Sequence, residues 1–175
     1  KVIYSTVALT FVLAFMLTIA PVFAAKGGNP DQPNVAHLNL YEKNPAGWTV
    51  VEGGAWGKMK YNLSGETFDF VFNGHGLTVG AEYSLIYYAD PWPGDNPGAL
   101  IGSGTVNEDG DIHIAGSEEL NMDIPHTDDA NYPGGAKIWL VTSADYNSGT
   151  NAMTGWNPTE YLFENNLIQY DDTDL

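Results

Sequence analysis

Apolar and polar side chains alternate along most of the chain beyond its first segment, which is the periodicity of β-strands with one buried face. Residues 67–73 show it most clearly, because three phenylalanines occupy alternate positions there. The same alternation recurs in residues 35–42, 56–63 and 83–88, and residues 48–52 are expected to form a shorter strand. These segments predict antiparallel strands that are half buried.

The second half of the chain adds further strand signals. Residues 99–106 and 111–115 flank an Asp-Gly pair, which predicts a hairpin because both turn residues tolerate a positive φ. Residues 136–143 are the most apolar run, so we expect a central strand, and residues 161–170 are predicted to close the sheet after one helical turn. About eight strands without an amphipathic helix favour an all-β fold, an antiparallel β-sandwich.

Leu77, Gly80 and Tyr83 follow one another at intervals of three in the segment that joins two of these strands. The pattern resembles the corner between the two sheets of fibronectin type III and immunoglobulin-like domains. The resemblance implies that the Tyr83 hydroxyl bonds back to the corner and that Leu77 fills one end of the sandwich. It therefore implies an immunoglobulin/fibronectin-like β-sandwich.

The first 24 residues are apolar behind Lys1 and contain no other charge, so a hydrophobic helical segment is expected there. Small residues before Ala25 favour a signal peptide that is cleaved after Ala24, so the protein is expected to be secreted and to act outside the cell or at its surface. A retained helix, as an anchor or in a filament core, is the alternative. The predicted organisation is thus residues 1–24, a linker at 25–34, the β-domain at 35–170 and an acidic tail at 171–175.

The chain carries 22 acidic and only 6 basic residues, for a net charge of −16, and it contains neither arginine nor cysteine. Such a surface repels phosphate backbones and anionic lipids, so nucleic acid and peripheral membrane binding are disfavoured. The missing cysteines exclude a disulfide scaffold, a thiol nucleophile and a cysteine zinc site. The remaining partners are other proteins, including further copies of the chain, and glycans.

No arrangement of residues predicts catalysis. The sequence lacks the nucleophile, zinc-protease and phosphate-loop motifs, and the alternation places His37 and His113 toward solvent. We therefore expect no catalytic residue, no bound organic cofactor and no enzymatic activity.

Calcium is the cofactor that the composition permits, because hard cations bind several oxygen ligands from closely spaced Asp and Asn side chains. Asp145, Asn147 and Asn151 offer oxygens at alternate positions of one loop, although no acidic residue closes it. Asp109 and Asp111 have similar spacing, which a plain hairpin turn also explains. These five residues are the candidate Ca²⁺ ligands.

Two tryptophans stand beside prolines in loops. Trp92 and Trp156 are candidates for a partner or sugar surface, since flat rings stack on carbohydrate faces and anchor protein interfaces. They could equally cap the ends of the sandwich. Asn62 begins an Asn-Leu-Ser glycosylation sequon at the end of a strand.

Residues 47–168, with segments such as YSLIYY, DPWPG and GWNPTEYLFE, resemble uncharacterised secreted β-sandwich domains of archaeal cell-surface proteins. The hypothesis that follows is an exported, non-enzymatic structural or adhesion module of the cell surface or extracellular matrix. The alternatives are a subunit of an extracellular filament, either pilin-like or strand-exchanged, and a carbohydrate-binding module.

Overall fold

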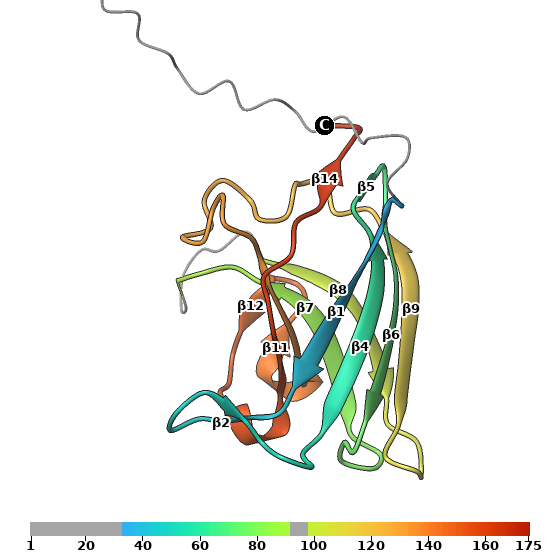
Figure 1. The fold of residues 1–175 in the computed structure, drawn as a ribbon, viewed down its shortest axis with the longest axis vertical. Helices are drawn as coiled ribbons and strands as arrows, with labels where there is room; N and C mark the ends of the chain where they lie inside the picture. Colours follow the sequence, from blue (N-terminus) through green and yellow to red (C-terminus); the bar gives the residue numbers. More distant parts are fainter. Residues whose placement is uncertain (1–32, 92–97) are drawn as a thin grey trace, which may run out of the picture. The chain divides into compact units, whose positions relative to one another are not determined.

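The computed structural model describes residues 33–91 and 98–175, and its main feature is one eight-stranded sheet (Figure 1). The strands of this sheet are β1 (Val35–Tyr41), β4 (Trp56–Asn62), β6 (Phe68–His75), β7 (Glu82–Tyr88), β8 (Ala99–Thr105), β9 (Ile112–Glu118), β10 (Lys137–Thr142) and β13 (Leu162–Glu164). Short elements complete the fold: β2 (Lys43–Asn44), β3 (Thr49–Val50), β5 (Ser64–Gly65), β11 (Tyr146–Asn147), β12 (Ala152–Met153), β14 (Asp171–Asp172) and the 3₁₀ turns η1 (Ser143–Asp145) and η2 (Pro158–Glu160).

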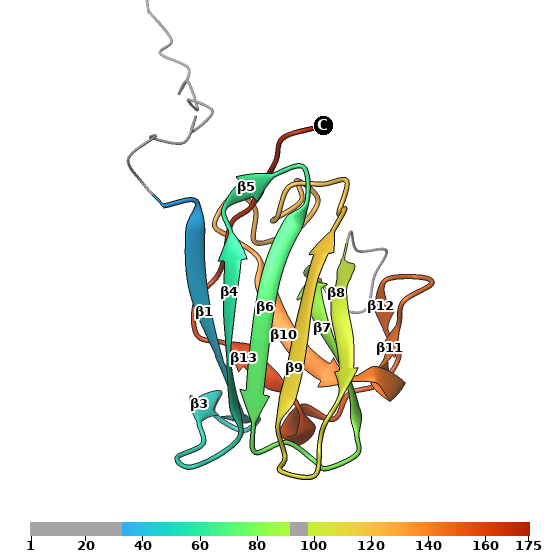
Figure 2. The ribbon, with the colours of Figure 1, turned by 90° about the vertical axis from the view of Figure 1, so that its right-hand side faces the viewer.

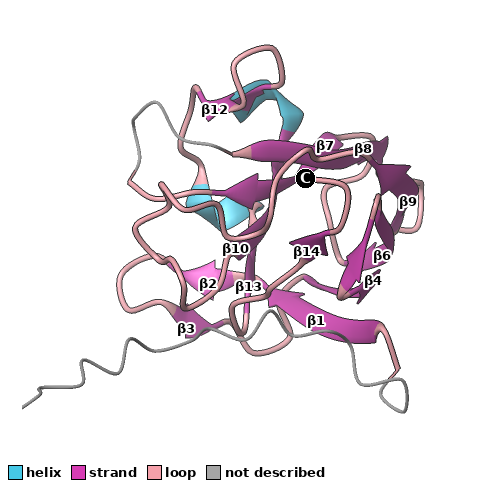
Figure 3. Cartoon of the chain, turned by 90° about the horizontal axis from the view of Figure 1, so that it is seen from above, coloured by secondary structure: helices cyan, strands magenta, loops and turns pink. Residues whose placement is uncertain are grey.

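The strands follow the order β8-β7-β10-β13-β1-β4-β6-β9, and every pair in this sheet is antiparallel. The sheet curls so that its strands surround the interior when seen from above (Figure 3). Its two edge strands, β8 and β9, run side by side (Figure 2), and a Cβ added to Gly102 would lie 2.8 Å from Ile114 Cγ2. The antiparallel all-β prediction is confirmed. The sheet, however, is closer to a barrel than to two separate layers.

The interior is filled by the apolar side of each alternating strand, as predicted. Phe68, Phe70 and Phe72 of β6 are all buried, while Asp69 and Val71 between them are exposed. Registered pairing carries this alternation across β4, β6 and β9, so their inward side chains form one continuous core. β10 lies between β7 and β13 and is buried on both faces, which confirms the prediction of an interior strand.

The corner between β6 and β7 crosses from one side of the curled sheet to the other. Gly80 has a φ of 75°, which a glycine adopts without strain, and Leu77 is buried at the end of the interior. The Tyr83 side chain is fully buried and its hydroxyl is hydrogen-bonded to Thr78, five residues earlier. The corner thus fastens two distant strands of the sheet by a local contact.

The predicted hairpin between residues 99–106 and 111–115 is wrong in its pairing. The turn itself forms, with the Asn107 amide donating to the Asp111 carbonyl at 2.9 Å. Beyond the turn, β8 pairs with β7 and β9 pairs with β6. The Asp-Gly signal fixes the reversal of the chain, but the strands diverge because each has a more extensive partner elsewhere.

The end of the chain also departs from the prediction. The expected strand at residues 161–170 is ordered as the three residues of β13, followed by single bridges from Ile168 and Tyr170. The acidic tail is part of the fold, because β14 pairs in parallel with β5 and Asp172 is only 5% exposed. The helical turn expected before residue 161 is confirmed as η2.

Three sequence predictions concern residues outside the described ranges. They are the N-terminal apolar segment at 1–24, most of the linker at 25–34, and Trp92. Among the residues that the structure does describe, no helix is both long and apolar enough to cross a membrane.

Candidate functional site

A second buried cluster covers the outer face of β7, β10 and β13. Its members are mostly aromatic and come from the strands and from the β11–β12 hairpin that folds over them: Ile86, Tyr88, Trp139, Val141, Tyr146, Met153, Tyr161 and Phe163. Tyr88 and Trp139 are stacked with their ring centroids 3.8 Å apart. This layer explains why β7 and β10 lack a polar side, and it provides a rigid base for the residues above it.

Trp48 and Trp156 lie on this layer and together form what we call the aromatic surface. Their side chains are 51% and 44% exposed, and their ring centroids are 6.2 Å apart with an interplanar angle of 50°. Trp48 meets Phe163 edge to face at 5.2 Å, and Trp156 contacts Trp139 at 5.8 Å. Two indoles from loops that are distant in the sequence therefore pack on the same aromatic layer, while about half of each side chain stays exposed to solvent.

Trp48 has a backbone conformation that is rare for a large residue, with a φ of 54°. It closes the turn between β2 and β3, where its amide donates to the Asn44 carbonyl at 2.7 Å and the Asn44 side chain accepts from the Ala46 amide at 2.9 Å. Glycine or asparagine would adopt this conformation at lower cost. An outlier of this kind, held at an exposed position, favours a functional role for the side chain.

Asp145 fixes the loop that carries Trp156. Its Oδ2 accepts hydrogen bonds from the Tyr161 hydroxyl at 2.5 Å, the Thr142 hydroxyl at 2.6 Å and the Asn157 amide at 2.8 Å. Burial acts to raise the pKa of this carboxyl, but the three donors outweigh it and the pKa is lowered. The ionised side chain is thus a structural anchor directly behind the aromatic surface.

Charged groups lie at the edge of the same aromatic layer. Burial raises the pKa of Glu164 to about 7, although Lys43, Lys137 and the Trp139 indole act to lower it. Its Oε2 is buried without a hydrogen-bond partner. Lys137 is bonded to Asp90 at 2.5 Å and also lies over the Tyr88 ring, 5.8 Å from the centroid.

The predicted Ca²⁺ ligands are not brought together. Asp145 is buried in the network above, Asn147 Oδ1 accepts from the Gly149 amide at 2.9 Å, and Asn151 Oδ1 accepts from the Tyr146 hydroxyl at 3.2 Å. The described ranges contain no group of three acidic or histidine side chains with metal-binding geometry. Calcium binding stays a prediction, and it finds no support in this loop.

The second candidate pair lies at the turn between β8 and β9. Asp111 Oδ1 lies 2.8 Å from His75 Nδ1, and both side chains are partly exposed. The backbone amides of Asp109 and Asp111 both donate to the Asn107 side chain, at 2.9 and 3.0 Å. The turn is therefore held by Asn107 and a neighbouring histidine, without need of a metal ion.

Asn62 of the sequon is engaged in the folded domain. Its amide nitrogen donates to the carbonyls of Ser64 at 3.2 Å and Thr67 at 2.8 Å, and its Oδ1 accepts from the Asp69 amide at 2.9 Å. A glycan on this nitrogen would replace one of its two N–H groups and disturb the β4–β6 connection. Glycosylation at Asn62 remains untested.

The sequence pointed to one half of the aromatic surface and missed the other. Trp156 was a candidate because prolines mark its loop, and the structure exposes it as expected. Trp48 was assigned to a short strand, although the preceding Pro-Ala-Gly turn signal could have indicated that it lies in a loop. The charges of the acidic loop at residues 118–135 are expected from the sequence to be solvated, but Asp129 in this loop is 3% exposed and accepts from the Tyr87 hydroxyl at 2.7 Å.

Comparison with protein-family models, with curated proteins and with solved structures found no match.

Proposed function

We propose that this protein is an exported, non-enzymatic adhesion module of the cell surface or extracellular matrix, and that it contacts its partner through the aromatic surface. Export is supported by the apolar segment at residues 1–24 and its small residues before Ala25. A finer relation to immunoglobulin-like and fibronectin type III sandwiches is part of the proposal and is supported by the corner at Leu77 and Tyr83. A relation to archaeal surface domains is also proposed, on the resemblance of residues 47–168.

The observation that carries the proposal is the pair of half-exposed indoles on a rigid aromatic layer. Tryptophan is enriched at the centres of binding interfaces, because it combines a large contact area with little conformational freedom to lose. Here the freedom is already restricted, since Trp48 is held by Phe163 and Trp156 by the Asp145 anchor. A φ of 54° costs conformational energy for a tryptophan, so Trp48 is better explained by the exposed position of its ring than by a gain in stability.

The test is adhesion of beads coated with the domain to cells, or to isolated envelope material, of the source organism. We expect Trp48→Ala and Trp156→Ala together to abolish adhesion, and each alone to weaken it. Val79→Ala is the matched control, because Val79 is 57% exposed but lies in the β6–β7 corner. Adhesion that the double variant leaves unchanged would refute the assignment of this surface, provided that circular dichroism shows a folded protein.

The filament alternative makes a different prediction. A retained N-terminal helix requires native protein that begins before Ala25, which mass spectrometry of the native N-terminus detects. Filaments in electron micrographs of native material, with a start at Ala25, would favour strand exchange between neighbours. The carbohydrate-binding alternative predicts that Trp156→Ala removes retardation of the domain in gels that contain neutral polysaccharide.

A further inference from the structure

The outer face of β1, β4, β6 and β9 is open to solvent along its whole length, and we call it the sheet face (Figure 2). It is made of the alternate residues of these strands, starting from Val35, Trp56, Asp69 and His113, and nearly all of them are exposed or half buried. Registered pairing places their side chains in rows across the sheet. No described element covers them, in contrast to the aromatic layer over β7, β10 and β13.

The sheet face gathers the free lysines of an acidic protein. Four lysines lie within the described ranges, and two of them, Lys58 and Lys60, point outward from β4. Neither has an ion-pair partner among the residues that the structure describes. The other two are bound elsewhere, since Lys43 donates to the Glu164 carbonyl and Lys137 to Asp90.

Three of the four histidines lie on the same face. His37 of β1 is in register with Lys60, and His113 of β9 accompanies Asn73 in the row of Lys58. The carboxylates that face these groups are Asp69, Asp111 and Glu66, which lies beside Lys60 near β5. Among the 22 acidic residues of the chain these are three, and one of them is paired with His75, so an anionic partner meets little repulsion on this face.

A groove of about 1140 Å³ occupies the end of the sheet face near β5. Lys60 lies at its side, Val71 and Ala115 contribute apolar surface, and hydroxyl groups come from Thr67 and Ser117. Both hydroxyls donate to Asp69 Oδ1, the Thr67 hydroxyl at 3.0 Å. An apolar floor with hydroxyl and carboxylate groups beside it suits a polyhydroxylated ligand, which presents C–H surface and alcohol groups together.

Aromatic rings occupy the opposite end of the sheet face. Trp56 is 44% exposed, pairs with Tyr41 across the sheet, and lies with its ring centroid 4.6 Å from that of His75 at an interplanar angle of 36°. Asp69 and His75 are six residues apart on β6, a length of roughly 20 Å at 3.3 Å per residue. The groove, the lysines and the rings thus follow one line along the strands.

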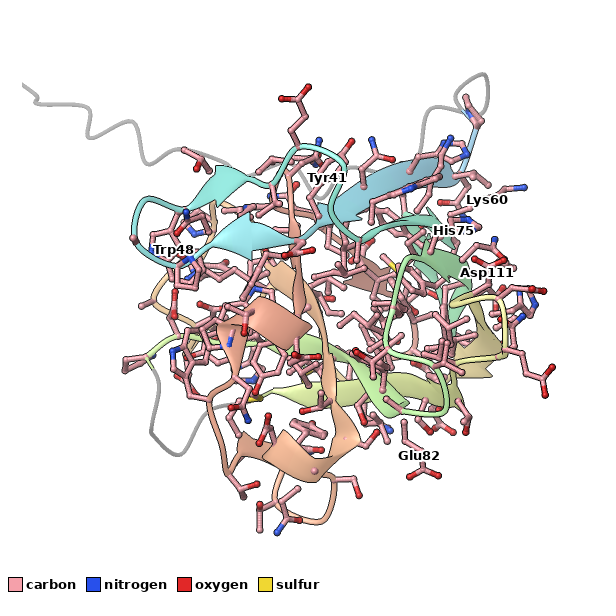
Figure 4. The ribbon with its side chains drawn as sticks, turned by 90° about the horizontal axis from the view of Figure 1, so that it is seen from below. Tyr41, Trp48, Lys60, His75, Glu82 and Asp111 are labelled. Carbon is pink, nitrogen blue, oxygen red and sulfur yellow. The ribbon has the colours of Figure 1, made fainter. Side chains whose placement is uncertain are left out.

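We propose that the sheet face binds an extended acidic polysaccharide, a chain of sugars that includes uronic acids. Lys58 and Lys60 bind carboxylates of the sugar chain, the groove takes its hydroxyl groups, and Trp56 stacks on a pyranose ring. This site does not depend on the aromatic surface, and Figure 4 shows Lys60, His75 and Asp111 on the side of the domain away from Trp48.

The experiment measures affinity electrophoresis of the domain in three polymers: polygalacturonate, its methyl-esterified form and polyglutamate. We expect retardation by polygalacturonate only, at low salt, and weakening as NaCl is raised because exposed charges are screened. Lys58→Gln and Lys60→Gln together are expected to weaken binding by about tenfold or more, equivalent to the loss of about 1.4 kcal/mol. Trp56→Ala is expected to weaken binding with an unchanged salt dependence.

Two control variants locate the binding. Lys43→Gln removes one positive charge away from the sheet face, and Trp48→Ala with Trp156→Ala removes the aromatic surface; both are expected to leave binding within about twofold, since surface substitutions rarely act at a distance. Equal retardation by the esterified polymer or by polyglutamate would overturn the proposal. A second result would also overturn it: the wild type binds no polygalacturonate but self-associates in sedimentation runs, and Lys58→Gln with Lys60→Gln abolishes the self-association. A second acidic copy of the chain would then be the partner. Loss of envelope adhesion with intact polygalacturonate binding would count against the aromatic surface alone.

Discussion

Glu164 should make the domain less stable as the pH rises from about 4.5 toward neutrality. Burial raises its pKa to about 7 from the ordinary value of 4.5, so the folded state holds a proton that the unfolded chain releases. Below about pH 4.5 both states are protonated and the residue has no effect. Between about pH 4.5 and 7 the folded state binds more protons, so the free energy of unfolding falls as the pH rises.

The magnitude follows from the two pKa values. At about 1.4 kcal/mol for each pH unit, the difference between 4.5 and about 7 corresponds to roughly 3 kcal/mol of lost stability above pH 7. Lys43, Lys137 and the Trp139 indole stabilise the ionised Glu164 carboxylate, and the pKa of about 7 already includes their effect. The unpartnered Oε2 is the structural reason why they do not suffice.

Urea unfolding followed by tryptophan fluorescence at pH 4.5, 5.5, 6.5 and 8 tests this reasoning. Glu164→Gln should be more stable than the wild type at pH 8, by an amount approaching roughly 3 kcal/mol, and should lose most of the decline between pH 5 and 7. Asp172→Asn is measured in parallel, because burial and Asp174 raise the pKa of Asp172 and give a slope of the same sign. Glu108→Gln, an exposed site, is the control. A Glu164→Gln curve parallel to that of the wild type would refute the reasoning.

Three further predictions concern the anchor, the closure of the sheet and calcium. Asp145→Ala should lower the free energy of unfolding by about 3 kcal/mol, because it leaves the buried Tyr161 hydroxyl without its acceptor. Because the pKa of Asp145 is lowered in the fold, the wild type should lose this stabilisation as the pH falls below about 4. Chemical denaturation measures both effects. Gly102→Ala should cost about 1 to 3 kcal/mol in thermal unfolding, since its Cβ would lie 2.8 Å from Ile114 Cγ2, and a neutral result would show that β8 and β9 do not pack as described. Millimolar Ca²⁺ should raise the melting temperature, with reversal by EDTA, if the calcium hypothesis holds; a flat response excludes a stabilising site.

The strands could be predicted where alternating apolar and polar residues show which face is buried. In β4 and β6 the buried face is marked by alternate apolar residues, with Trp56 and Val71 as the apolar exceptions on the outer face, so the strands and their inward sides follow from the sequence. The pairing of β8 could not be predicted, because its inward positions include Gly102 and Gly104, whose fit depends on Ile112 and Ile114 of another strand. A turn signal fixes a few residues, whereas the choice of a partner strand is decided by how the interior is filled.

The candidate site was predictable in part for the same reason. Trp156 lies in a loop that Asn157 and Pro158 mark, whereas the place of Trp48 on the aromatic layer depends on its ring contact with Phe163, which is distant in the sequence. Asp145 resembled a metal ligand because acidic and amide residues recur around it. Its donor Tyr161 lies sixteen residues further on, a distance over which local spacing carries no information.

The two outer faces of the sheet explain why the proposed binding surfaces are separate. β7 and β10 have apolar residues at both alternating sets of positions, so their outer face must be covered, and the covering loops carry Trp48 and Trp156. The outer positions of β4 and β6 are mainly polar, with Trp56 and Val71 as exceptions, so that face needs no cover and keeps its lysines in solvent. Occupation of one surface therefore leaves the other free. A complex of the domain with polygalacturonate should still bind envelope material through the aromatic surface, and competition between the two would show that they share one site.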